Sequence, residues 1–137
     1  MDLRKILITS VVGVVASFAV GIGFYMAYYQ NLFASLQEEF PNVMNEEPNF
    51  AVGLIVTIAQ VFLVAMYFDK SNVSSAKSGA INGAWISVAI WAVANGNMMA
   101  MTKLTNMSYF LTDLGISGVM GAVVGVAMAW MMGRLSK

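Results

Sequence analysis

One acidic residue, Asp113, lies within the long apolar segments of this chain and is its strongest candidate for chemistry. Polar side chains at membrane depth are costly, and by default they mark functional sites. Asn95, Asn97, Tyr25 and Tyr29 fall toward the same end of their own apolar segments. We expect these residues and Asp113 to form a polar ligand-binding pocket. The alternative is structural, because amides cross-link helices and an Asp in the first turn of a helix interacts favourably with the helix dipole.

The composition excludes much other chemistry. The chain has no Cys and no His, so it lacks thiolate nucleophiles, disulfides, imidazole bases and the usual zinc ligands. We therefore predict a non-enzymatic protein without a cofactor. Trp91, near the middle of its segment, either lines the predicted pocket or contacts lipid and core. Four methionines cluster in the sequence: Met98, Met99, Met101 and Met107. We expect them to pack in the core. The alternative is a copper site, because thioethers are suitable ligands for Cu(I).

Four apolar segments must position these residues. Apolar residues make up 59% of the 137 positions and charged residues 10%, whereas a soluble domain carries about 25% charged residues. A helix that spans a bilayer needs about 20 consecutive apolar residues. We predict an all-α integral membrane four-helix bundle, with residues 1–137 as a single transmembrane domain. The predicted spans are at about residues 6–29, 50–68, 78–101 and 110–132.

The basic residues predict the orientation of these spans. Six of the seven Lys and Arg residues fall on one side of a four-span topology, and only Lys103 falls on the other. Lys and Arg concentrate in cytoplasmic loops, so we expect both termini in the cytoplasm and the protein in a bacterial inner membrane. The outer loop would be residues 30–49. Within it, Leu32 and Leu36 are at helical spacing and predict a short interfacial helix that ends at Pro41, with an extended loop as the alternative.

Small residues recur four positions apart in three of the predicted spans. In lipid, such spacing lets helix backbones approach closely. The contact could lie within one chain or between copies of it. The residues are Gly13, Ser17 and Gly21 in the first span, Gly79, Gly83 and Ser87 in the third, and Ser117, Gly121, Gly125, Ala129 and Gly133 in the fourth.

The first span also resembles a known family. Its segment Gly21-Ile22-Gly23-Phe24-Tyr25 is similar to the Gly-x-x-Trp-Tyr segment of small four-helix bacterial membrane proteins of unknown function, with Phe24 in place of Trp. The resemblance implies a four-helix membrane fold and no established activity. Further similar stretches are Gly79-Ala80-x-x-Gly83-x-Trp85, Asp113-Leu114-Gly115 and Val119-Met120-Gly121-Ala122.

Two functions follow from these patterns. The small-residue stripes favour an oligomeric or accessory subunit of a membrane assembly, whose partners are the bilayer and copies of itself or other membrane proteins. The polar cluster favours a small transporter or ligand-binding membrane protein. Small multidrug exporters share this length, but they depend on an acid deep in the first helix, and no ionisable residue follows Lys5 there. The net charge of zero argues against binding to nucleic acid, which needs a basic face.

Overall fold

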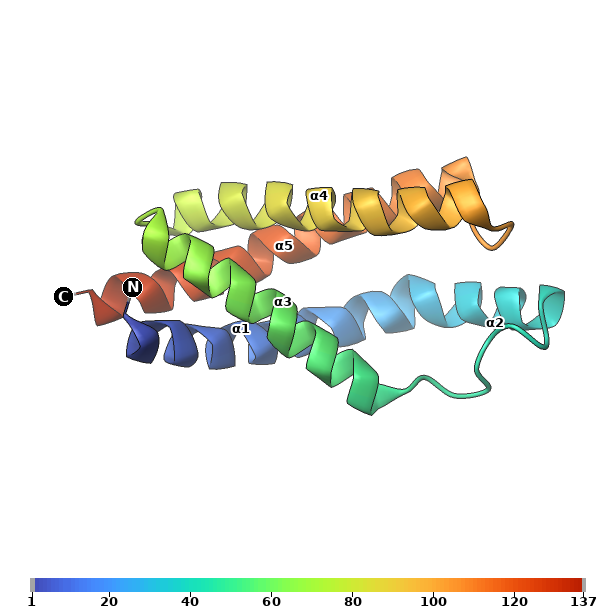
Figure 1. The fold of residues 1–137 in the computed structure, drawn as a ribbon, viewed down its shortest axis with the longest axis horizontal. Helices are drawn as coiled ribbons and strands as arrows, with labels where there is room; N and C mark the ends of the chain where they lie inside the picture. Colours follow the sequence, from blue (N-terminus) through green and yellow to red (C-terminus); the bar gives the residue numbers. More distant parts are fainter. Residues whose placement is uncertain (1, 137) are drawn as a thin grey trace.

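The structure, a computed structural model, describes residues 2–136, and every regular element in this range is helical (Figure 1). Four continuous helical stretches are long and apolar enough to cross a membrane, which agrees with the four predicted spans. The first stretch, Leu3–Glu39, contains three consecutive elements, and each of the others is one helix. The elements are α1 (Leu3–Phe24), η1 (Tyr25–Tyr29), α2 (Gln30–Glu39), α3 (Phe50–Lys70), α4 (Ala76–Met101) and α5 (Met107–Leu135).

The first stretch extends ten residues beyond its predicted end, because α2 continues from η1 without a break. The predicted outer loop of residues 30–49 therefore starts only at residue 40, and the predicted short helix is α2 itself. The physical reason is the lack of a helix breaker before Pro41, since the residue preceding a proline is disfavoured in the helical region. Phe40 accordingly leaves it, at φ −129° and ψ 63°.

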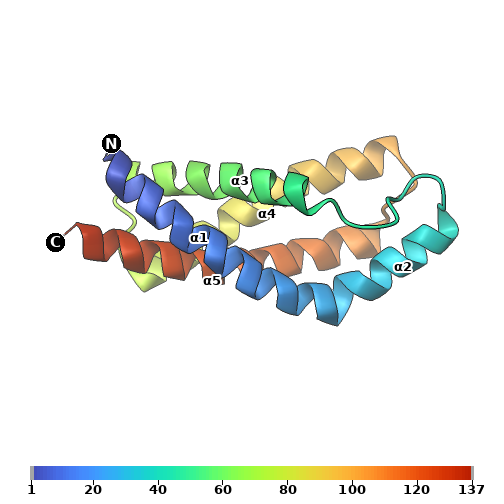
Figure 2. The same ribbon diagram turned by 90° about the horizontal axis from the view of Figure 1, so that it is seen from below.

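The element η1 is a single turn of π-helix. Such turns are a known cause of helix kinks. Figure 2 shows that the first stretch bends in this region, so that α2 leaves in a different direction from α1.

Side-chain caps fix where the other helices begin. Asn49 accepts a hydrogen bond from the Val52 backbone N–H before α3, and Asn106 accepts one from the Tyr109 N–H before α5. Ser75 and Ser78 form a reciprocal capping box at the start of α4. Each cap satisfies a backbone donor that the first turn of a helix leaves without a partner.

Helices α4 and α5 lie side by side as an antiparallel pair (Figures 1 and 2). Their small-residue stripes face one another in the same chain. A Cβ atom added to Gly83 would collide with the Gly121 carbonyl oxygen and lie 2.9 Å from the Gly125 Cα. A Cβ added to Gly79 would lie 2.5 Å from the Cβ of Ala129. The backbones are therefore in direct contact, as small residues permit.

Helix α1 lies between α5 and α3, and Gly13 is the point where it meets both. A Cβ on Gly13 would collide with Val61 of α3 and lie 2.8 Å from the sulfur of Met128 on α5. Figure 1 shows α3 crossing α1 obliquely from this region.

The buried core occupies only one half of the molecule, the half at which both termini and the loop of residues 71–75 lie (Figure 1). We call this the terminal end, and we call the opposite end, with residues 40–49 and 102–106, the loop end. Toward the loop end, every residue of α3 from Phe50 to Val56 is exposed. The core residues are Ile6, Val61, Ala65, Phe68, Val73, Met128, Ala129 and Met132.

Candidate functional site

Asp113 is buried and joins three helical elements. Only 3% of its surface is exposed. Its Oδ1 atom accepts a hydrogen bond from the Tyr29 hydroxyl of η1, and its Oδ2 atom accepts one from the Asn95 side-chain amide of α4. Asn95 is itself buried, with 6% of its surface exposed. Three polar residues that are distant in the sequence therefore meet at one carboxyl group.

The position of Asp113 along α5 weakens one structural explanation for it. Because α5 begins at Met107 rather than near residue 110, Asp113 lies in the second helical turn and not in the first. The favourable effect of the helix dipole falls off within the first turn. The two side-chain donors, and not the helix end, are therefore the interactions that hold this carboxyl group.

A cleft of about 770 Å³ extends from Asp113 toward the terminal end. Its wall is mostly apolar and comes from the first helical stretch, α3, α4 and α5. It also includes several polar side chains: Ser17, Thr57, Gln60, Ser87, Asp113 and Ser117. Along α5 it reaches Met128, which lies about 22 Å from Asp113 at 1.5 Å per residue. The cleft is thus a long apolar space with a carboxyl group near one end.

The oblique path of α3 explains why this space exists. Val61, where α3 meets α1, is buried, whereas the loop-end part of α3 has no neighbour that buries it. One face of α3 lines the cleft at a helical spacing, through Phe50, Thr57, Gln60 and Val64. A helix that diverges from its neighbours beyond one crossing point leaves a gap that side chains of ordinary size do not fill.

The structure separates the predicted site residues into two groups. Four of the predicted site residues line the cleft: Tyr25, Tyr29, Trp91 and Asp113. Asn95 donates a hydrogen bond to Asp113 but is not among the residues that line the cleft. Asn97 is exposed on α4, because two residues advance the direction of a helical side chain by about 200°. The four methionines lie near the adjoining ends of α4 and α5, where Met98, Met101 and Met107 are exposed.

Several cleft residues were not among the predicted site residues. Tyr109 lines the cleft and precedes Asp113 by one helical turn, a spacing that places both on one face. Phe33 lines it from α2, because the first helical stretch is longer than predicted. Thr57 and Gln60 line it because of the path of α3. Of these, Tyr109 and Gln60 had a signal in the local sequence: Tyr109 by its spacing from Asp113, and Gln60 as a polar residue in the middle of an apolar segment.

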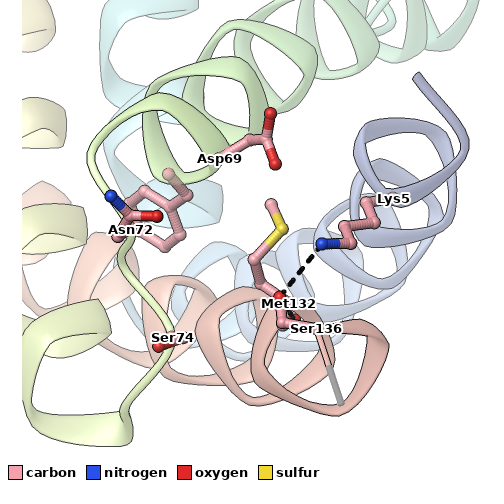
Figure 3. A pocket seen from close by; sticks show the side chains of 7 residues that line it. Lys5, Asp69, Asn72, Ser74, Met132 and Ser136 are labelled. Atoms are coloured by element: carbon pink, nitrogen blue, oxygen red, sulfur yellow. Dashed lines mark hydrogen bonds between the residues drawn. The ribbon is translucent and has the colours of Figure 1, made fainter. Parts of the chain in front are cut away.

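A second and smaller cavity, of about 130 Å³, lies at the terminal end (Figure 3). Lys5 and Asp69 are both in its wall, and the Lys5 ammonium donates to the Ser136 hydroxyl at 3.3 Å. The backbone N–H of Asp2 donates to Asp69 at 3.2 Å. These contacts join the start of α1 to the ends of α3 and α5 at the terminal end.

Comparisons with protein-family models, with curated proteins and with solved structures found no match for this chain. The resemblance in the first span therefore stays a prediction.

Proposed function

We propose that this chain is a non-enzymatic, membrane-embedded binding protein that holds a single-tailed amphiphile. The tail would occupy the apolar cleft and the head group would lie at Asp113. The observation that carries this proposal is the cleft itself, which has a volume of about 770 Å³, a wall from all four helical stretches and a buried carboxyl group near one end. Ligand pockets in proteins have volumes of about 300–1,000 Å³ and combine apolar walls with a few polar groups.

The length of the cleft supports an amphiphile rather than a compact ligand. It follows α5 for about 22 Å, whereas one leaflet contributes about 15 Å to the hydrocarbon core of a bilayer. A molecule with one lipid-like tail therefore has the proportions of this space. A short polar molecule would leave most of the apolar wall without contacts.

The proposed setting is a bacterial inner membrane with both termini in the cytoplasm. The support is the distribution of Lys and Arg residues, six of which fall on one side of the four spans. In this orientation the loop end, and with it Asp113, lies toward the outer leaflet. An amphiphile from that leaflet could then enter with its head group near the membrane surface and its tail pointing inward.

The oligomeric or accessory subunit stays a prediction with less geometric support. That prediction was based on the small-residue stripes. In this structure the stripes of α4 and α5 pack against each other. Gly21 of the first stripe lines the cleft. Close packing within one chain therefore accounts for the stripes of α4 and α5, whereas Gly21 has a place in the cleft wall instead.

The test uses Trp91, because its side chain is in the cleft wall. The changes Trp85→Phe and Trp130→Phe leave Trp91 as the single tryptophan of the chain. The protein is held in a detergent-free amphipathic polymer and titrated with dodecyldimethylphosphine oxide, an uncharged amphiphile, brominated on its tail. Bromine quenches tryptophan fluorescence on contact, so we expect saturable quenching.

A pair of glycine variants provides the matched control. A Cβ on Gly21 would have only an ordinary contact of 3.7 Å with Met120, and a Cβ on Gly23 would have no neighbour within 4 Å. Gly21→Phe should fill the cleft and abolish the saturable quenching, whereas Gly23→Phe, outside the cleft, should preserve it. Equal quenching in both variants would show that the tail does not enter the cleft, and the proposal would be wrong.

A further inference from the structure

We propose that the cleft selects amphiphiles whose head group is an organic cation, such as an alkylammonium. This inference rests on the proposed function, since it names the head group for the same cleft. It concerns binding and not proton-coupled export. Its basis is the combination of a buried carboxyl group held by neutral donors with aromatic side chains at the same end of the cleft.

Within residues 2–136, the side-chain oxygens of Asp113 accept hydrogen bonds only from neutral groups. The side chain of Asp113 accepts one from the Tyr29 hydroxyl and one from the Asn95 amide, and both groups are neutral. These bonds orient the carboxyl group, and they would not compensate the negative charge of its ionised form. A buried charge is stabilised most by an opposite charge, which a cationic head group would supply.

Aromatic rings surround the same end of the cleft. Tyr25, Tyr29 and Phe33 line it from the first helical stretch, Trp91 from α4 and Tyr109 from α5. The faces of aromatic rings carry negative potential and attract cations, and aromatic cages are a general means of binding quaternary ammonium groups. An anionic head group would be repelled both by these ring faces and by Asp113.

The rings of the first stretch are held in place by one another. The Tyr29 and Phe33 rings are stacked with their centroids 5.9 Å apart, and the Tyr25 ring lies 6.4 Å from that of Phe33. The hydroxyl of Tyr29 is also fixed on Asp113. Because these groups are already positioned, a ligand would not have to order them, and pre-ordering of this kind raises affinity.

The experiment compares two amphiphiles that have the same brominated dodecyl tail, one ending in trimethylammonium and the other in uncharged dimethylphosphine oxide. Affinity is measured by quenching of Trp91 in the single-tryptophan protein. We expect the cation to bind about tenfold more tightly. The conservative change Asp113→Asn should remove this preference while the uncharged amphiphile still binds.

A second variant tests the rings while keeping Tyr29 and Asn95, the two side chains that donate to Asp113. The double change Tyr25→Leu and Phe33→Leu should weaken binding of the cation by several-fold and leave binding of the uncharged amphiphile nearly unchanged. This double variant also tests the preference for a cationic head group if Asp113→Asn does not fold.

The outcomes distinguish this inference from the function on which it rests. Equal affinities for the two amphiphiles in the cleft with Asp113 intact, or tighter binding of the uncharged one, would overturn the cationic head group and leave the amphiphile-binding cleft standing. Absence of saturable quenching by either amphiphile would overturn both.

Discussion

The change Gly83→Ala tests the packing that positions the cleft. An alanine Cβ at this position would lie 2.9 Å from the Gly125 Cα, where ordinary contacts begin at 3.4 Å, and it would also collide with the Gly121 carbonyl oxygen. Both neighbours are backbone atoms, which cannot rotate away. Helices α4 and α5 would therefore have to separate by at least about half an ångström, the sort of displacement that overpacking produces.

The magnitude follows from a comparison with Gly96→Ala on the same helix. The added Cβ there would lie 3.9 Å from the Phe110 ring, an ordinary contact. Both substitutions gain the same intrinsic helix propensity, up to about 1 kcal/mol, so their difference isolates the packing term. Overpacking costs about 1–3 kcal/mol. Gly83→Ala should therefore be less stable than Gly96→Ala by that amount.

The assay is thermal unfolding of both variants and the parent protein in one detergent, followed by circular dichroism. For a chain of this length, 1 kcal/mol corresponds to a few degrees in Tm. We expect Gly96→Ala at or above the parent in Tm, and Gly83→Ala below Gly96→Ala by about 3–12 °C. A Gly83→Ala protein as stable as Gly96→Ala would refute the direct backbone contact of α4 with α5.

Three further predictions concern the carboxyl group, the core and the orientation. Tyr29→Phe removes a donor to the buried carboxylate and should cost about 1–3 kcal/mol; an unchanged Tm would mean that this bond contributes nothing. Phe68→Ala, at a fully buried position, should cost about 3–5 kcal/mol, whereas Phe50→Ala, at a residue that is 77% exposed, should change unfolding little; similar losses would contradict the one-sided core. In whole cells, a membrane-impermeant maleimide should label Asn45→Cys but not Ser74→Cys, and the reverse pattern would invert the proposed topology.

The four helical stretches could be predicted because a spanning helix needs a continuous apolar run, which is a local property of the sequence. The predicted ends of the helices were less accurate where the apolar run and the helix-breaking residues indicate different positions. The sequence predicts that the first span ends at Tyr29, where the apolar run stops. In the structure the helical hydrogen bonding of the backbone continues to Glu39, close to Pro41, which disfavours a helical conformation of the residue before it. Hydropathy marks membrane depth, whereas helix breakers mark the end of a helix.

The cluster around Asp113 could be predicted in part from position along the spans. Residues near the same end of antiparallel helices lie at one level, which brought Tyr29, Asn95 and Asp113 into one group. The direction of each side chain around its helix was harder to predict. Asn97 shares the level but points elsewhere, and Tyr29 points to Asp113 from a π-helical turn whose position the sequence does not reveal.

The cleft itself could not be predicted, because it depends on the path of a whole helix. Its existence follows from the crossing of α3 over α1 at Gly13 and Val61 and from the divergence of α3 beyond that point. A crossing angle results from the fit of many side chains on both helices. The small-residue stripes show that close approaches occur, but not which helix approaches which.

The chain order of the helices has a consequence for biosynthesis. Chains are synthesised from the N-terminus, so the close pair α4 and α5 is made after α1, η1, α2 and α3. Until α5 emerges, Tyr29 and Asn95 have no carboxyl group to bind, and the stripe of α4 has no partner. The cleft can therefore be completed only after α5 has been made. A nascent protein arrested before Met107 would leave the glycine stripe of α4 without the backbone contacts that α5 makes with it in the structure.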